Sequence, residues 1–137
     1  MNKELQQKLY DRFPDLYRQK DLPMSQTCMC WGFDVDDGWF EIVWMLSLAL
    51  EDESKQTGSK IEAVQVKEKF AGLRFYTDGS TKRAYDLISL AEGMSYHICE
   101  VCGKNGRTCS RGSWLKTVCK DHATELKYTW PEKKEEE

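Results

Sequence analysis

The chain is predicted to fold as an α+β domain: a central buried helix with a β-hairpin, flanking helices and a C-terminal zinc-binding module. Three observations predict this class. Residues 38–53 are apolar on nearly every side of a helix. Residues 61–76 alternate apolar and polar side chains with the period of a strand. Residues 99–122 hold cysteine and histidine at the spacing of a metal site. With 137 residues, the chain suits one domain of ordinary size.

Composition and charge limit the classes of function. The net charge of −3 argues against a protein that coats DNA, because such binding needs clustered cations. The N-terminus lacks the apolar core of a signal peptide, so the six cysteines indicate a reducing compartment more than a set of disulfides. The longest apolar run, Ile42 to Leu50, is too short to span a bilayer. We therefore expect a cytoplasmic protein without a membrane partner.

The first third of the chain is predicted to contain one helix followed by irregular structure. Asn2 can cap a helix over residues 2–13, whose apolar stripe comprises Leu5, Leu9 and Phe13. Residues 19–36 favour irregular structure. Within them, the spacing of Cys28 and Cys30 is poor for a zinc knuckle and favours two partly buried thiols, with a second metal site as the alternative.

The second helix is predicted to form the centre of the core. It is expected to run from about Gly38 to Glu53, with an aspartate, Asp36 or Asp37, capping its first amides. Apolar side chains cover both of its faces, so it should be buried on more than one side. A polar loop is expected from Glu51 to Lys60.

Residues 61–76 are predicted to form a hairpin, and residues 81–95 a third helix. On the first strand Val64, Val66 and Phe70 are expected on one buried face, and the turn is expected at Ala71-Gly72. On the return strand Leu73 and Phe75 should share the buried face. The third helix should face the core with Ala84, Leu87, Ile88 and Ala91.

The C-terminal module is predicted to bind zinc. Its expected ligands are two short pairs separated by sixteen residues: Cys99, Cys102, Cys119 and His122. Thiolates and imidazole suit Zn²⁺ in a closed tetrahedral shell, which leaves no open position for water or substrate. A knuckle, a hairpin and a ligand pair on a helix start describe a treble-clef or zinc-ribbon module. We expect a core over residues 1–95, the module over 96–130 packed on it, and a charged flexible tail over 131–137.

The hairpin carries a second candidate site for an anionic small ligand. Two lysines, an arginine and a tyrosine are expected on its less apolar face: Lys67, Lys69, Arg74 and Tyr76. Arginine offers a fork to phosphate or carboxylate, and tyrosine offers a stacking surface. The alternative is a solvated strand face with Arg74 paired to Glu62 or Glu68.

Several segments together resemble a family of short bacteriophage and prophage proteins, most of them uncharacterised. The motifs are D-D-G-W-F-x-I-V-x-x-L ending at Leu46, V-K-E-K-F-A-G-L-R-F-Y over Val66 to Tyr76, S-x-x-x-C-E-V-C-G ending at Gly103, and C-K-D-H-A from Cys119. The resemblance covers roughly residues 31–123. It implies a zinc site and a phage origin, but no activity that can be transferred.

The predicted function is that of a non-enzymatic binding protein. No nucleophile triad, phosphate-binding loop or deaminase motif is present in the sequence. The favoured partner is a host protein, which the chain would inhibit or recruit as an adaptor in the bacterial cytoplasm. The alternative is an anti-defence protein that sequesters a nucleotide signal on the hairpin face. A nucleic-acid-binding zinc protein is third, supported only by the basic residues of the module.

Overall fold

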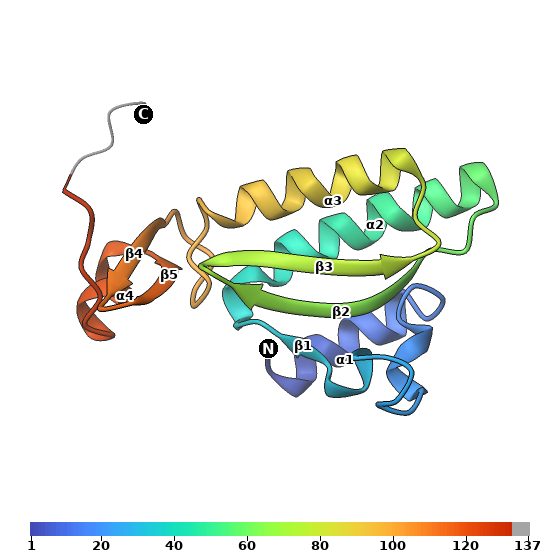
Figure 1. The fold of residues 1–137 in the computed structure, drawn as a ribbon, viewed down its shortest axis with the longest axis horizontal. Coiled ribbons are helices and arrows are strands. Elements are labelled where there is room, and N and C mark those ends of the chain that lie inside the picture. Colours follow the sequence, from blue (N-terminus) through green and yellow to red (C-terminus); the bar gives the residue numbers. More distant parts are fainter. Residues whose placement is uncertain (133–137) are drawn as a thin grey trace.

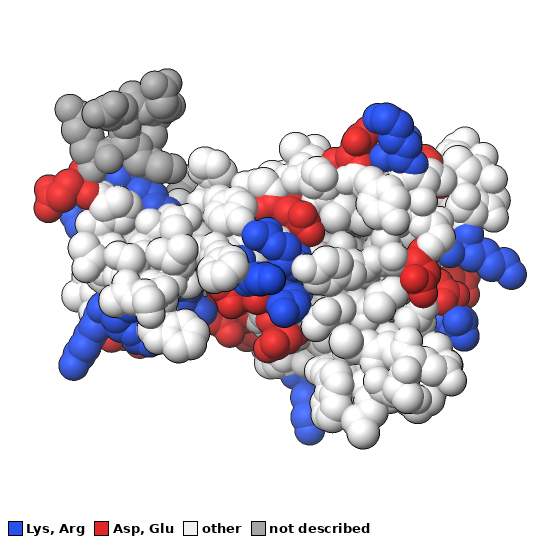
Figure 2. Space-filling model, viewed as in Figure 1, with Lys and Arg blue, Asp and Glu red and all other residues white. Residues whose placement is uncertain are grey.

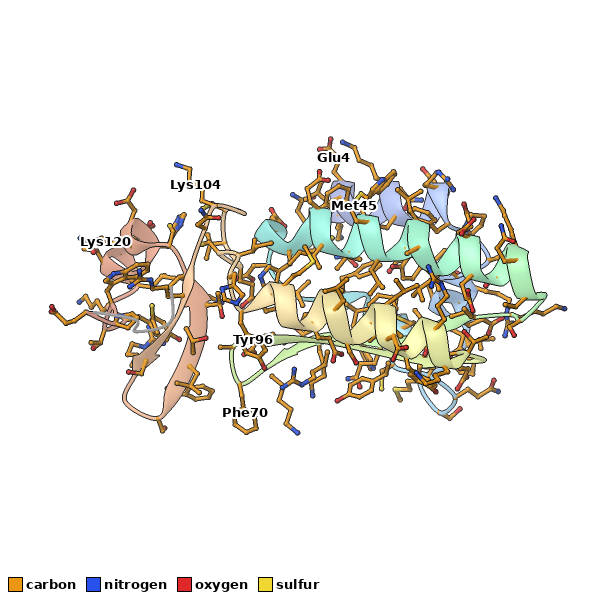
Figure 3. The ribbon with its side chains drawn as sticks, turned by 90° about the horizontal axis from the view of Figure 1, so that it is seen from above. Glu4, Met45, Phe70, Tyr96, Lys104 and Lys120 are labelled. Carbon is orange, nitrogen blue, oxygen red and sulfur yellow. The ribbon has the colours of Figure 1, made fainter. Side chains whose placement is uncertain are left out.

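The computed structural model describes residues 1–132 and has a mixed α/β fold (Figure 1). A three-stranded sheet has the order β1-β2-β3, with β1 parallel and β3 antiparallel to β2. The longest helix, α2, lies between α1 and α3 in both ribbon views (Figures 1 and 3). These elements span α1 Lys3–Arg12, β1 Phe33–Asp34, α2 Phe40–Thr57, β2 Glu62–Lys69, β3 Gly72–Asp78 and α3 Lys82–Ser95.

The first helix forms where the sequence predicts it. The Asn2 carboxamide oxygen accepts a hydrogen bond from the Leu5 amide at 2.8 Å and so caps α1. Residues 19–36 are less irregular than expected. They contain strand β1 and the short 3₁₀ helix Met29–Trp31, and β1 adds a third strand to the expected hairpin.

The second helix is the central helix of the core, as predicted, but it starts and ends differently. Its buried side chains come from one broad face: Ile42, Val43, Leu46 and Leu50. It continues past the expected loop start at Glu51 to Thr57, where Gly58 in a left-handed conformation (φ 78°) ends it. The predicted aspartate cap is wrong, because a 3₁₀ turn, Asp37–Trp39, precedes the helix and no side chain caps that turn.

The hairpin forms, but its turn lies one residue earlier than predicted. Phe70 and Ala71 occupy the turn with positive φ (51° and 72°), and Lys69 pairs with Gly72. Phe70 is therefore 67% exposed instead of buried. A register shift between Ala63 and Gln65 changes the alternation, so Ala63 and Val66 are buried while Val64 is only half-buried. The expected burial of Leu73 and Phe75 is confirmed.

Helix α3 covers the outer edge of strand β3. Thr81 caps the helix by accepting a hydrogen bond from the Ala84 amide. The Ser95 hydroxyl accepts from the Leu73 amide and the Glu92 carboxylate accepts from the Phe75 amide, each at 2.9 Å. These two bonds satisfy amides that an edge strand would otherwise expose. Of the residues predicted to face the core, Leu87 is half-buried and the other three are buried.

The C-terminal part forms a small unit with its own apolar cluster. It consists of β4 (Arg107–Arg111), β5 (Trp114–Val118) and α4 (Lys120–Glu125), and β4 pairs antiparallel with β5 as predicted. Cys99, Cys109, Val118, Cys119 and Ala123 form its buried cluster, separate from the main core. In Figure 1 this unit lies beyond the turn end of the hairpin. Most of the predicted flexible tail, residues 133–137, lies outside the described residues.

Candidate metal centre and hairpin face

The four predicted metal ligands lie together in the C-terminal unit. One ligand atom from each of Cys99, Cys102, Cys119 and His122 lies within 4.8 Å of the other three. The two sulfur atoms of Cys102 and Cys119 are 3.8 Å apart, and His122 Nδ1 lies 3.7 Å from the Cys99 sulfur and 3.2 Å from the Cys119 sulfur. Such a group of three thiols and an imidazole can hold a metal ion.

Local backbone structure positions both ligand pairs. The Gly103 amide donates to the Cys99 carbonyl at 2.9 Å, and Gly103 has φ 82°, which closes the knuckle around the first pair. In the second pair, Cys119 is the N-cap of α4, and its sulfur accepts from the His122 amide at 3.4 Å. One helical turn therefore brings the sulfur and the imidazole to the same point.

Backbone amides favour the thiolate form of the most buried ligand. Burial alone would raise the pKa of Cys99, but hydrogen bonds from the backbone of Cys119, Cys102 and Val101 outweigh it and lower the pKa. The thiolate is the form that binds metal.

The other histidine nitrogen faces a carboxylate. His122 Nε2 lies 3.7 Å from Glu125 Oε2, one turn further along α4. This separation is longer than a hydrogen bond, so the carboxylate lies near the ring without fixing its orientation.

The knuckle packs directly against the start of α2. The Gly38 amide donates to the Glu100 carbonyl at 2.7 Å, and the Trp39 indole donates to the Ile98 carbonyl at 2.8 Å. A side chain at position 38 would not fit, because its Cβ would lie 2.2 Å from the Cys99 carbonyl oxygen. Trp39 is fully buried, so its predicted place in the core is confirmed.

A buried carboxylate joins the knuckle to the segment before α2. Glu100 Oε2 accepts from the Asp36 amide at 3.0 Å, and Glu100 Oε1 lies 3.1 Å from the Lys116 ammonium, which also reaches Asp36. Burial raises the pKa of Glu100, although the charge of Lys116 opposes the shift. Lys116 therefore compensates a carboxylate that is only 2% exposed.

The same unit also contacts the hairpin turn. Thr117 Oγ1 donates to the Ala71 carbonyl at 2.8 Å, and both residues are fully buried. Gly72 lies against the Tyr96 ring, since a Cβ there would approach the Tyr96 hydroxyl to 2.3 Å. The knuckle, the start of α2 and the hairpin turn, which are far apart in sequence, therefore meet at one junction.

The four predicted ligand-binding residues of the hairpin lie on one face of the sheet. Lys67 and Arg74 are directly opposite each other on β2 and β3, and Lys69 and Tyr76 follow by the alternation of the strands. Figure 2 shows Lys and Arg atoms near the middle of this side of the molecule, with Asp and Glu atoms above and below them. The ammonium of Lys69 lies 5.6 Å from the centre of the Phe70 ring.

Arg74 does not pair with either predicted glutamate. It donates to the Leu73 carbonyl and to the Tyr96 hydroxyl, each at 3.1 Å. The Tyr96 contact is the main cause of a raised pKa of Arg74. Glu62 instead binds Arg18, and Glu68 accepts from the Ala71 amide.

The remaining cysteines lie outside the ligand cluster. Cys28 and Cys30 are free and half-buried, as the favoured interpretation predicts. Cys109 is buried within the C-terminal unit, on β4, where burial raises its pKa. Within residues 1–132, the cluster around Cys99 is the one group of Cys, His, Asp and Glu with metal-site geometry.

Sequence reasoning missed the junction residues Asp36, Gly38, Glu100 and Lys116. Asp36 and Gly38 contact residues more than sixty positions away, so no local sequence pattern predicts these contacts.

Comparison of the chain with protein-family models, curated proteins and solved structures finds no significant match. Among the described residues, no helix combines the length and apolar character needed to cross a bilayer.

Proposed function

We propose that this chain is a zinc-stabilised, non-enzymatic binding protein that acts by contacting another protein. The observation that carries the proposal is the position of the Cys99 cluster at the junction of the knuckle, α2 and the hairpin turn. A metal bound there would tie the knuckle, whose backbone contacts the start of α2, to the start of α4, and four protein ligands would complete its coordination. The arrangement belongs to the treble-clef or zinc-ribbon class in this proposal, since a knuckle and a helix start supply the two ligand pairs.

Ligand separations support zinc as the metal. Bond lengths of about 2.3 Å to sulfur and about 2.0 Å to nitrogen give tetrahedral edges of about 3.8 Å between sulfurs and about 3.5 Å between sulfur and nitrogen. The separation of the Cys102 and Cys119 sulfurs is 3.8 Å, and the two nitrogen–sulfur separations are 3.2 and 3.7 Å. Three thiolates and one imidazole also favour zinc over the oxygen-seeking magnesium and calcium.

Exposed large side chains support a protein partner. Phe70 is 67% exposed at the turn of the main hairpin, and Trp114 is 69% exposed beside the turn of the β4–β5 hairpin. Phenylalanine and tryptophan are typical of the residues that carry binding energy at protein interfaces. The resemblance to phage proteins favours a bacterial host protein as that partner.

The test is affinity capture with folded, zinc-loaded protein from bacterial lysate. We expect a specific partner to be recovered, and we expect Phe70→Ala or Trp114→Ala to weaken its recovery. Metal analysis of the same preparation should give about one Zn²⁺ per chain. Repeated recovery of nothing by folded protein with a full metal site would contradict the proposal.

A small anionic ligand on the hairpin face is the second candidate. The specific observation is that two cations, Lys67 and Arg74, stand directly opposite each other on adjacent strands. Like charges in this position destabilise a sheet unless negative charge compensates them. Asp34, the register partner of Lys67 on β1, supplies one negative charge beside the pair, and a bound anion would compensate the remaining positive charge. A nucleotide phosphate would do so, and the exposed ring of Tyr76 would offer a stacking surface.

A thermal-shift screen with mononucleotides and cyclic nucleotides tests this candidate. Binding should raise the melting temperature of the native protein, and Lys67→Ala should abolish the increase. Lys67 is a better position to substitute than Arg74, because Arg74 also donates a hydrogen bond to Tyr96 in the folded chain. No increase with any nucleotide, or an equal increase for Lys67→Ala, would remove this candidate.

A further inference from the structure

An apolar groove runs between α2 and α3 on the surface of the core. Its lining comes from both helices and includes Ile42, Met45, Ala49, Leu87, Leu90 and Met94, and its volume is about 240 Å³. Three of these side chains are exposed: Met45 by 60%, Leu90 by 63% and Met94 by 46%. Figure 3 looks down on the two helices and labels Met45 on α2. Contiguous exposed apolar side chains that line a groove make it a candidate interaction surface.

The groove has the form of a helix-binding site. Two packed helices leave a furrow into which a third helix can place apolar side chains at positions i, i+4 and i+7. The lining extends from Glu41 to Ala49 along α2, about 12 Å, which gives room for about two turns of a partner helix. Methionines at positions 45 and 94 can adapt their flexible side chains to different apolar groups.

Charge at the ends of the groove favours a basic residue on the partner. Of its ten lining residues, the one that carries charge is Glu41. Among residues 1–132, Glu41 has no hydrogen-bond or ion-pair partner. Nearer the start of α3, Arg83 lies 3.6 Å from Glu53. The Glu41 end therefore presents a free carboxylate to a bound molecule.

The size of the groove argues against a second copy of the chain as its occupant. A stable interface of standard size uses about 20–30 residues on each side. The groove offers ten. A second copy seated on the groove alone would therefore contact fewer residues than a standard subunit interface uses, whereas ten residues suffice for one helical segment.

We infer that the α2–α3 groove binds an amphipathic helix of a partner protein, which carries an apolar i, i+4, i+7 stripe and a lysine or arginine opposite Glu41. This inference rests on the proposed protein-binding function and names the surface and the chemistry of the partner.

A display library of helical peptides, panned against the zinc-loaded full chain, tests the inference. Selected peptides should share the apolar stripe and one basic residue. Their affinity should fall at least tenfold for Leu90→Glu and for Met45→Glu. Tyr85→Glu is the matched control, because Tyr85 is 54% exposed on the same helix and does not line the groove. The affinity of the selected peptides for Tyr85→Glu should equal their affinity for the wild type.

A charge exchange tests the predicted contact of Glu41. Glu41→Lys should weaken the binding of peptides that carry a basic residue opposite position 41. Replacing that basic residue of the peptide by glutamate should restore binding to the Glu41→Lys variant. No enriched peptide, or equal binding to Leu90→Glu and wild type, would overturn the inference. So would a concentration-dependent dimer that Leu90→Glu dissociates, since the occupant would then be a second copy.

The experiments distinguish an error in the groove inference from an error in the proposed protein-binding function. A lysate partner that wild type and Leu90→Glu recover equally would preserve the protein-binding function and overturn the groove. If selected peptides bind in a Leu90-dependent way but no partner is recovered from lysate, the groove inference is supported and the proposed function is contradicted.

Discussion

At the residue scale, the sequence predicts the four candidate metal ligands but does not predict the residues that hold the knuckle against the start of α2. The spacing of Cys99 and Cys102, and of Cys119 and His122, predicted which four side chains come together, because a knuckle and one helical turn are local structures. Gly38 has no such local signal. Its lack of a side chain matters because the knuckle backbone occupies the space that a Cβ would take.

Two glycine substitutions test this close approach. Gly38→Ala should destabilise the protein by about 3 kcal/mol, because the Cβ would meet backbone atoms of Cys99 and Glu100 that cannot move aside cheaply. Gly93→Ala is the matched control: it lies in α3, no atom lies within 4 Å of the new Cβ, and its helix propensity should stabilise by about 0.5 to 1 kcal/mol. Urea unfolding of both variants gives the two values. Equal effects of the two substitutions would show that the knuckle does not depend on Gly38.

At the element scale, the helices were easier to predict than the strands. Apolar spacing located α1 and α3 closely, since a helix depends on contacts within a few residues. The hairpin was placed with its turn one residue late, because Phe70 is apolar and extends the strand pattern into the turn. Strand β1 was missed because two residues carry no periodicity, and the pairing with Val66 and Lys67 that defines β1 comes from a distant segment.

Strand β3 depends on α3 for the hydrogen bonds of its outer edge. Ser95→Ala should cost about 1 to 3 kcal/mol, because the Leu73 amide would lose its acceptor in a fully buried position. Ser89→Ala, at an exposed position of the same helix, should change stability by less than about 0.5 kcal/mol. Denaturant unfolding measures both. Hydrogen exchange should also speed up at the Leu73 amide in Ser95→Ala, and unchanged protection there would contradict this account of the edge.

At the scale of the whole molecule, the apolar side chains form two clusters, one in the core and one in the C-terminal unit. The main core contains side chains of α1, α2, α3 and the sheet, and the smaller cluster surrounds Cys99 and Cys119. Polar contacts of Asp36, Glu100 and Lys116 connect the two. The sequence predicted both parts but not how they meet, since their docking depends on contacts between residues 36–39 and 98–116.

Metal removal should therefore loosen one part of the molecule more than the other. With a strong chelator, hydrogen-exchange protection should fall over residues 98–130 and at the Gly38 amide, while β2 and β3 keep most of theirs. Cys102→Ser should have the same effect without chelator, because Cys102 is an exposed ligand that contributes little to packing. Cys30→Ser is the control and should retain the metal. Full protection of residues 98–130 in metal-free protein would contradict a structural metal.

The docking of Glu100 onto Asp36 also has a consequence for synthesis of the chain on the ribosome. The two residues are 64 positions apart, so the start of α2 is made long before its acceptors. At roughly 5–20 residues per second, the Asp36 and Gly38 amides and the Trp39 indole wait on the order of 3 to 13 s for residues 98–100. During this interval we expect the Trp39 end of α2 to lack the hydrogen-bond acceptors that it has in the folded protein. We expect a chaperone that recognises apolar segments to bind this part of the nascent chain, and to be displaced once residues 98–100 are available to pack against it.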